Sequence, residues 1–460
     1  MTAIGLTILI VLMVVILLMP RQWAALGVIA GVIYLTDGQH LYIGGLNIFA
    51  IRFIEVAGII RIISKKEFFF EKLNIIDKSF IVFQCVYLLA FFIRSVVEPS
   101  LIETRAYRIG FLVDGLMSYF IFRGLLNDPT ELKLFLKKCA ILIIPFALFM
   151  GIEGMTGKNL FFFMGGVREI PVIRDGYYRA QASFGVAITA GSFGATMLPL
   201  FIYTTISSDG RLWGAIGIIA CLAITITSYS SGPILGLIAG ITAWMCWFLR
   251  TRMSAIRWAI VGFFIILQLM MNPPIWFIFS KISAITGGDG WHRSNLIDQF
   301  VNHFKNWWLM GMSLEKTGNW AATRLESGSV DVTNEYVSLG IRGGLISVFL
   351  FIRLIVKCYR SLGASMQVAR GDLINGKQNE LLLWGIGCTL FTHVVNITAV
   401  RYWDQMFVIW YMTLALVSSM TAYFLQVKFK EYMKGVKISN IYSMDNDIMS
   451  KERKTPLIVD

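Results

Sequence analysis

Long apolar runs recur along nearly the whole chain, and each has about the length needed to cross a bilayer. The hydrocarbon core of a membrane is about 30 Å thick, so a spanning helix needs roughly 20 apolar residues. Runs of about 17–22 residues give about thirteen candidate spans. These cover residues 3–19, 22–36, 41–63, 80–96, 108–125, 138–155, 182–206, 212–228, 231–249, 256–272, 336–356, 380–399 and 404–425. The pattern predicts an all-α polytopic membrane protein with about 12–14 transmembrane helices.

The composition supports this class and excludes two others. Of the 460 residues, 56% are hydrophobic and 15% are charged, which leaves a soluble domain too little polar surface to cover itself. The net charge of +13 does not indicate nucleic acid, because the basic residues fall in short connections between apolar runs. Neither the six cysteines nor the four histidines have metal-ligand spacing, so we expect no metal and no cofactor.

The basic residues between the spans predict the orientation of the chain. They gather in alternate connections, as Lys65, Lys66, Lys72, Lys78, Lys133, Lys137, Lys138, Arg211, Arg250, Arg252, Arg257, Lys357, Arg360, Arg370 and Lys377. With the spans above, all of these lie on one side, which the positive-inside rule makes cytoplasmic. We expect a transmembrane domain over residues 1–425 and a polar, disordered cytoplasmic tail over residues 426–460.

Two connections on the opposite, external side carry positive charge against this rule. One covers residues 156–181 and contains Arg174 and Arg179, and the other is the large loop 273–335, which contains Arg293. Charge placed against the topological preference indicates a role beyond topology. We therefore expect a functional site on this side.

Arg179 stands at the mouth of a predicted span. Small residues at positions 182, 185, 187, 190, 191 and 194 let neighbouring backbones approach closely there. Arg179 is then either an interfacial arginine that extends toward the lipid headgroups or a ligand of an anion. The residues alone favour the interfacial arginine over the anion ligand.

The segment 293–308 has apolar residues at helical spacing, with polar residues on the other face. This predicts an amphipathic helix that lies along the membrane surface with its tryptophans at headgroup depth. Arg293 falls in its first turn, where the helix N-terminus and the guanidinium group are able to hold one anion together. The alternative is an ordinary interfacial helix whose Arg293 meets a lipid phosphate.

Two acidic residues precede the next span. Asp331 and Glu335 are four residues apart, so they share one face if the helix begins this early. The alternative is capping, with Asp331 or Thr333 as the N-cap and Glu335 stabilised by the helix dipole. Capping explains the presence of one acidic residue at the start of a helix more readily than it explains two acidic residues that both face a basic site.

Four motifs follow one another along the external side. They are Arg-Ala-Gln-x-Ser-Phe at 179–184, an arginine that opens an amphipathic helix and leads to a glycine (293–311), x-Asn-x-Tyr at 333–336, and Gly-x-x-Gly-Gly at 340–344. In this order and on this side, they resemble the O-antigen ligase and Wzy-type polymerase superfamily of bacterial surface polysaccharide assembly. The resemblance covers residues 179–344 in motifs and the whole chain in architecture.

The resemblance implies an inverting, metal-independent glycosyltransferase of GT-C-like architecture in the inner membrane, with its active site facing the periplasm. The donor would be a glycan on undecaprenyl diphosphate, and the acceptor another such glycan or a lipid. Arg179 and Arg293 would hold the diphosphate, with Arg174, Arg324 and His292 as accessory candidates. A flippase and a chain-length regulator would be partner proteins.

The sequence departs from the family pattern at one position. The loop histidine that usually precedes the asparagine of x-Asn-x-Tyr is absent, and Thr333 stands there. The proton acceptor is then Asp331 as first candidate and Glu335 as second, with His292 or His303 behind them. The missing histidine favours a polymerase over a ligase.

A transporter or flippase of lipid-linked oligosaccharide is the alternative function. It requires polar groups within the spans, for which Arg52, Glu55 and Asp114 are the main candidates. A structural scaffold, the third possibility, leaves the external arginines unexplained.

Overall fold

Long helices make up most of the structure. The computed structural model describes residues 1–44, 46–68, 73–98, 104–207, 209–286, 288–320, 328–372, 375–403 and 405–426. The long helices are α1 (Ala3–Leu18), α2 (Arg21–Tyr34), α3 (Ala50–Ser64), α4 (Ile75–Val97), α5 (Arg105–Leu125), α6 (Pro129–Thr156), α7 (Ala187–Ile206), α8 (Arg211–Thr227), α9 (Ser231–Met245), α10 (Met253–Met270), α14 (Glu335–Arg370), α15 (Gly376–Asn396) and a last helix Gln405–Gln426. Every predicted span overlaps one of them.

Six stretches of the described chain are long and apolar enough to cross a membrane. They are α4, α6, α7, α14, the last helix, and Ser231–Met270, which contains α9, a 3₁₀ turn η3 (Cys246–Arg252) and α10. Two further apolar helices, α1 and α8, are shorter. These helices indicate an all-α, multi-pass protein of the lipid bilayer. Of the predicted tail, residues 427–460 lie outside the described residues.

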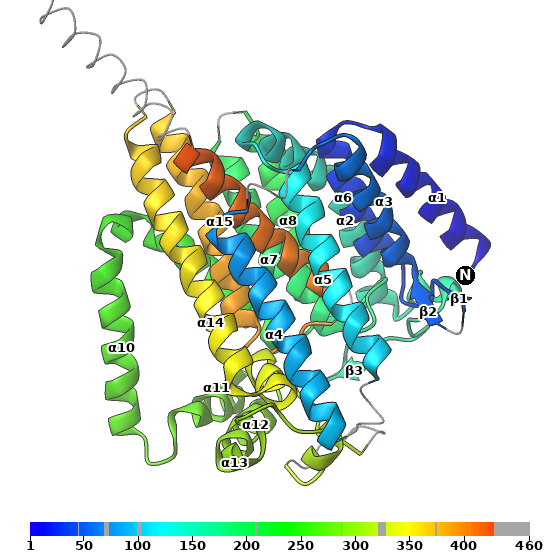
Figure 1. Cartoon of the computed structure of the whole chain (residues 1–460). Helices are drawn as coiled ribbons and strands as arrows, with labels where there is room; N and C mark the ends of the chain where they lie inside the picture. The colour runs from blue at the N-terminus through cyan, green and yellow to red at the C-terminus, as the bar shows by residue number, and fades with distance from the viewer. Residues whose placement is uncertain are drawn as a thin grey trace, which may run out of the picture.

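The short elements gather at one end of the helix bundle (Figure 1). Helices α11 (Ile278–Thr286), α12 (Gly290–Asn302) and α13 (Phe304–Trp307) lie there, as does the hairpin of β3 (Ile173–Arg174) and β4 (Tyr177–Tyr178). The last described helix ends at the opposite end of the bundle. The described parts of the two connections that the sequence predicts on one side, residues 156–181 and the loop 273–335, therefore lie at the same end of the bundle.

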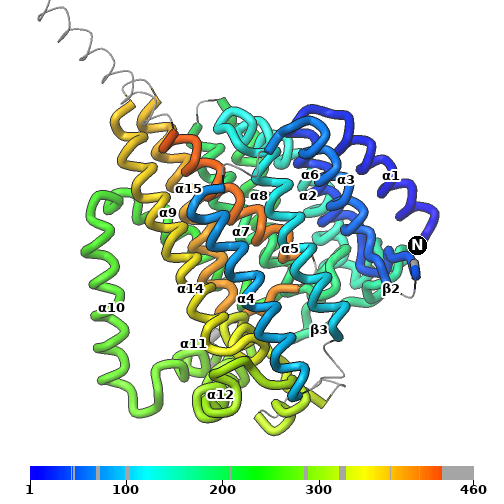
Figure 2. The backbone as a smooth tube through the Cα atoms, in the orientation of Figure 1, coloured from blue at the N-terminus to red at the C-terminus, as the bar shows by residue number. Residues whose placement is uncertain are grey.

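Helix α10 stands apart from the rest of the bundle (Figure 2). None of its residues is buried, although every other long helix has a buried face. Apolar side chains such as Phe264 and Leu269 are exposed along it. A helix of this composition is stable without helix partners only where lipid surrounds it.

Close glycine contacts hold α7 in the centre of the bundle. A Cβ at Gly194 would lie 2.7 Å from the carbonyl oxygen of Cys221 in α8, and one at Gly191 would lie 2.7 Å from the Cβ of Ser228. A side chain does not fit at either position, because α7 packs there against the backbone of Cys221 and the side chain of Ser228. The small residues after Arg179 therefore have the packing role that the sequence predicted.

The predicted span 41–63 is wrong in its first part. Residues before Ala50 form an antiparallel hairpin of β1 (His40–Ile43) and β2 (Leu46–Phe49), with His40 opposite Phe49. Gly44 has a φ of +59°, so it takes the left-handed conformation that ends a strand and excludes a helix there. A glycine turn between β-branched and aromatic residues indicates a hairpin, and that signal outweighs apolar length.

The predicted surface helix is also different. It begins at Gly290, breaks at His303 and continues as α13. Part of its apolar face packs inward: Trp307 is 3% exposed and stacks on Phe300 at 3.8 Å between ring centroids, while Val301, Phe304 and Trp308 stay exposed. These rings cover Gly340 in α14. The loop thus has its own small core, formed by Leu296, Trp307, Met312, Leu314, Trp320, Val330, Val332, Val337 and Ile341.

The glycine motif at 340–344 forms a kink that admits the loop. Gly344 has φ 71° and ψ −177° inside α14, and the amide of Leu345 donates to the carbonyl of Trp308 at 2.8 Å. A Cβ at Gly344 would overlap the carbonyl oxygen of Leu309 and lie 2.9 Å from the Met310 nitrogen. The motif therefore has a packing role.

We expect Gly344→Ala to destabilise the protein by about 1–3 kcal/mol, because alanine at this φ is strained and its methyl group meets backbone. The thermal unfolding temperature in detergent measures the effect. Gly363→Ala is the matched control, since it lies in the same helix and its Cβ would meet nothing within 4 Å. Equal unfolding temperatures for the two variants would contradict this account of the kink.

Candidate functional site

Arg179 and Arg293 converge on one turn. Nη2 of Arg179 donates to Oγ of Ser230 at 2.8 Å, and Nη1 of Arg293 donates to Oγ of Ser231 at 3.2 Å. Arg179 follows β4 and Arg293 lies in the first turn of α12, while the two serines open α9. Three distant parts of the sequence thus meet at one end of the bundle.

Arg174 belongs to the same place. It pairs with Tyr177 across the β3–β4 hairpin, whose turn residues Asp175 and Gly176 have φ of +50° and +83°. A Cβ at Gly288 would lie 3.8 Å from Nη2 of Arg174 and 3.0 Å from Oγ of Ser231. The loop before α12 therefore lies between Arg174 and α9. We call Arg174, Arg179 and Arg293 the arginine cluster.

The cluster concentrates positive charge in a partly buried place. Burial lowers the pKa of Arg179, and the nearby charge of Arg174 lowers it further. Burial also lowers the pKa of Arg293, where Asp289 opposes the shift and Arg174 and Arg179 add to it. The Nε atoms of Arg179 and Arg293 are buried and have no hydrogen-bond partner among the described residues. Buried guanidinium groups with free donors are costly unless an anion completes them.

The beginning of α9 adds to this field. Ser230 is its N-cap but makes no capping hydrogen bond. Its hydroxyl donates to the carbonyl of Ser228 at 2.9 Å and accepts from Arg179. No side chain caps the first turn of α9, in which Pro233 has no N–H, and the positive end of the helix dipole lies beside the arginines. The combination suits a phosphate group.

Backbone strain is concentrated around the cluster. Among the described residues other than glycine, four have positive φ: Lys66, Asp175, Ala182 and Tyr229. Three of them lie in the segments that carry Arg174, Arg179 and Ser230. Such conformations persist only where surrounding structure enforces them, and they are common at functional sites.

The two acids do not share a helix face. Helix α14 begins at Glu335, and its N-cap is Asn334, whose side chain accepts from the amides of Tyr336 and Val337. Neither Asp331 nor Thr333 caps the helix, which corrects the predicted alternative. The extended stretch before Asn334 separates Asp331 from Glu335.

Asp331 lies beside His292. Nε2 of His292 hydrogen-bonds to the Asp331 carbonyl oxygen at 2.8 Å, and His292 immediately precedes Arg293. Burial raises the pKa of the Asp331 carboxyl, which the charges of His292 and Arg401 oppose and that of Asp289 reinforces. Asp331 therefore contacts the residue that precedes Arg293.

Glu335 faces Arg401 rather than the arginine cluster. Its Oε2 accepts from the Tyr402 amide at 3.3 Å. Burial lowers the pKa of Arg401, as does the charge of Arg342, while Glu335 opposes the shift. Sequence reasoning missed Arg401 and Arg342. Arg401 falls in a connection on the external side, where the positive-inside rule does not expect positive charge. The same departure from the rule drew attention to Arg179 and Arg293.

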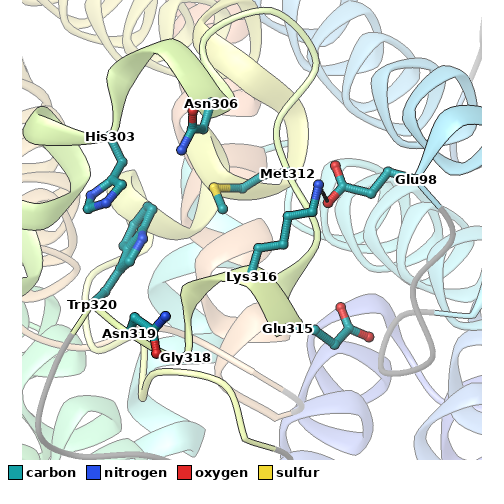
Figure 3. A pocket seen from close by; sticks show the side chains of 9 residues that line it. All are labelled: Glu98, His303, Asn306, Met312, Glu315, Lys316, Gly318, Asn319 and Trp320. Atoms are coloured by element: carbon teal, nitrogen blue, oxygen red, sulfur yellow. Dashed lines mark ion pairs between the residues drawn. The ribbon is translucent and has the colours of Figure 1, made fainter.

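A cavity of about 610 Å³ opens at the same end of the molecule, beside the last turn of α4 (Figure 3). Lys316 and Glu98 point toward one another there, 2.7 Å apart, and His303 stacks on Trp320 at 5.1 Å. None of its lining residues belongs to the arginine cluster. His303, an outlying candidate for the proton acceptor, is in this cavity.

Two further sequence predictions concern Arg324 and metal ligands. Arg324 lies outside the described residues. Within the described parts of the chain, no three His, Cys, Asp or Glu side chains come together as a group able to hold a metal ion. The positive charges that act on Asp331 are those of His292 and Arg401.

We expect the arginine cluster to bind inorganic pyrophosphate, and the double variant Arg179→Gln/Arg293→Gln to lose that binding. Each lost charge-assisted contact should weaken affinity about tenfold to 100-fold. Titration calorimetry of the detergent-solubilised protein measures both constants. Arg252→Gln, an exposed arginine in η3, is the control. Equal affinity of the double variant and this control would disprove the assignment.

No protein-family model matches this chain, and no curated protein proves recognisably similar to it.

Proposed function

We propose that this chain is a glycosyltransferase of bacterial surface polysaccharide assembly, which transfers a glycan from undecaprenyl diphosphate to a glycan acceptor. The observation that carries the proposal is the convergence of Arg179 and Arg293 on Ser230 and Ser231. In this proposal the protein has about 12–14 spans in a GT-C-like arrangement in the inner membrane. The loop 273–335 faces the periplasm and the C-terminus the cytoplasm.

The arginine cluster supports this chemistry by its charge. When a glycan leaves a lipid diphosphate, negative charge develops on the departing phosphate. Guanidinium groups held in place before the reaction stabilise that charge more in the transition state than in the ground state. Transfer of this kind uses energy already present in the donor and needs no nucleotide.

The acceptor hydroxyl needs a base on the opposite face of the donor sugar for inversion. Asp331 is the candidate that the geometry favours, because its charge interacts with His292, the neighbour of Arg293. A carboxylate there accepts the hydroxyl proton as the new glycosidic bond forms. Glu335, which the Tyr402 amide and Arg401 hold, is the second candidate.

The transporter alternative finds less support. Nε and Nη2 of Arg52 donate to the two carboxylate oxygens of Asp114 at 2.9 and 3.0 Å. The Ser118 hydroxyl donates to Glu55 at 2.5 Å. Arg52 and Asp114 thus satisfy one another between α3 and α5, which gives this pair a structural role, while Oε2 of Glu55 has no hydrogen-bond partner among the described residues.

We expect Arg293→Lys to lower the rate of transfer about 100-fold or more, because lysine keeps the charge but not the planar fork that binds two phosphate oxygens. The assay follows glycan growth on purified protein with lipid-linked oligosaccharide and no nucleotide sugar. Arg252→Lys should remain as active as the unaltered protein. Near-normal polymer in cells that carry Arg293→Ala would contradict the assignment.

We expect the activity to fall as pH decreases through the raised pKa of Asp331, because the base works only when ionised. Asp331→Asn should abolish this limb of the kcat/KM profile and reduce the rate about 100-fold. The His292 contact survives this change because it uses the backbone carbonyl. Loss of the limb in Glu335→Gln instead would make Glu335 the base.

A further inference from the structure

Two exposed tyrosines stack on one another at the edge of the arginine cluster. The rings of Tyr177 and Tyr229 have centroids 4.6 Å apart and planes 10° apart. Tyr177 is 55% exposed and Tyr229 is 39% exposed. A large, stacked aromatic surface is thus open to whatever binds beside the arginines.

Both tyrosines are placed by segments that also place the arginine cluster. Tyr177 lies directly opposite Arg174 in the β3–β4 hairpin, so the two side chains leave the same face. The next residue, Tyr178, points the other way, and a Cβ at Gly157 would meet its ring at 2.5 Å. Tyr229 immediately precedes Ser230 and Ser231, which hold Arg179 and Arg293.

The backbone at Tyr229 is held in an unfavourable conformation. Its φ is +42°, which a bulky side chain rarely adopts. The strain keeps the ring exposed and over Tyr177. Three requirements thus coincide at one place: an open aromatic face, an enforced backbone, and adjoining cations.

We propose that Tyr177 and Tyr229 form a saccharide platform, on which the donor sugar nearest the diphosphate packs. Pyranose rings present C–H groups on one face, and these pack favourably against the electron-rich face of an aromatic ring. That sugar is covalently joined to the phosphate, so its platform must adjoin the phosphate ligands, as Tyr177 and Tyr229 do. The inference rests on the proposed function, since it assigns the sugar subsite of the same donor. The alternative to be tested is that the two tyrosines contact the lipid headgroup layer, where tyrosines serve as membrane anchors.

The test uses the full-length protein in detergent and two probes. One is the lipid-linked oligosaccharide that accumulates in cells from which this chain has been deleted, and the other is undecaprenyl diphosphate without sugar. The variants are Tyr177→Ala, and Tyr229→Gly, which tolerates the positive φ. The matched ring-retaining variants are Tyr177→Phe and Tyr229→Phe. Trp308→Ala, at an exposed aromatic residue on the same end, is the control.

We expect Tyr177→Ala and Tyr229→Gly each to weaken binding of the glycosylated probe about tenfold. The two phenylalanine variants and Trp308→Ala should bind it as the unaltered protein does. Affinity for undecaprenyl diphosphate should not change in any of them.

Two results would overturn the platform while leaving the proposed function intact. Equal losses for both probes would show that the tyrosines only support the arginine cluster, and no loss for either probe would make them membrane anchors. Failure of the proposed function looks different: no glycan-bearing lipid would accumulate in the deleted cells, or the unaltered protein would bind neither probe.

Discussion

The meeting of two guanidinium groups with the first turn of α9 is the interaction on which the rest of this end of the molecule depends. Arg179 and Arg293 approach through Ser230 and Ser231, and their Nε atoms have no partner among the described residues. Two like charges beside a positive helix end repel one another. The surrounding fold must therefore supply the energy that holds them together, and an anion recovers part of it.

Close backbone packing holds the cluster in place. Gly288 approaches Ser231, and Gly191 lies against Ser228, just before the serines that contact the arginines. On the other side, the loop's own core and the kink at Gly344 fix α12 against α14. Because the two glycines bring side chains directly against the backbone, these contacts leave little freedom for the arginines to separate. This rigidity is what electrostatic stabilisation of a transition state requires.

Apolar length and charge placement were enough to predict the helices and that the segments with Arg179 and Arg293 share one end of the molecule. They failed where a local signal competed with length, as at Gly44, where a turn converts the start of a span into a hairpin. Amphipathic spacing correctly predicted the helix α12, but not that part of its apolar face packs against α14. Periodicity shows that one face of a helix is apolar, but it does not show what covers that face. The four-residue spacing of Asp331 and Glu335 suggested a shared helix face, but Asn334 is the N-cap and Asp331 therefore precedes the helix.

The part of the site that sequence could not reveal is the part made by contacts between distant segments. Ser230 and Ser231 belong to no motif of the sequence, and only the fold brings Arg179 and Arg293 into contact with them. Arg401 carried the same charge signal as those arginines, yet it lies with Glu335 and Arg342 and not with them. Asp331, whose charge interacts with His292 and Arg401, lies beside the residue that precedes Arg293. In the proposed reaction, this carboxylate takes the proton of the acceptor hydroxyl while the arginine cluster holds the donor phosphate.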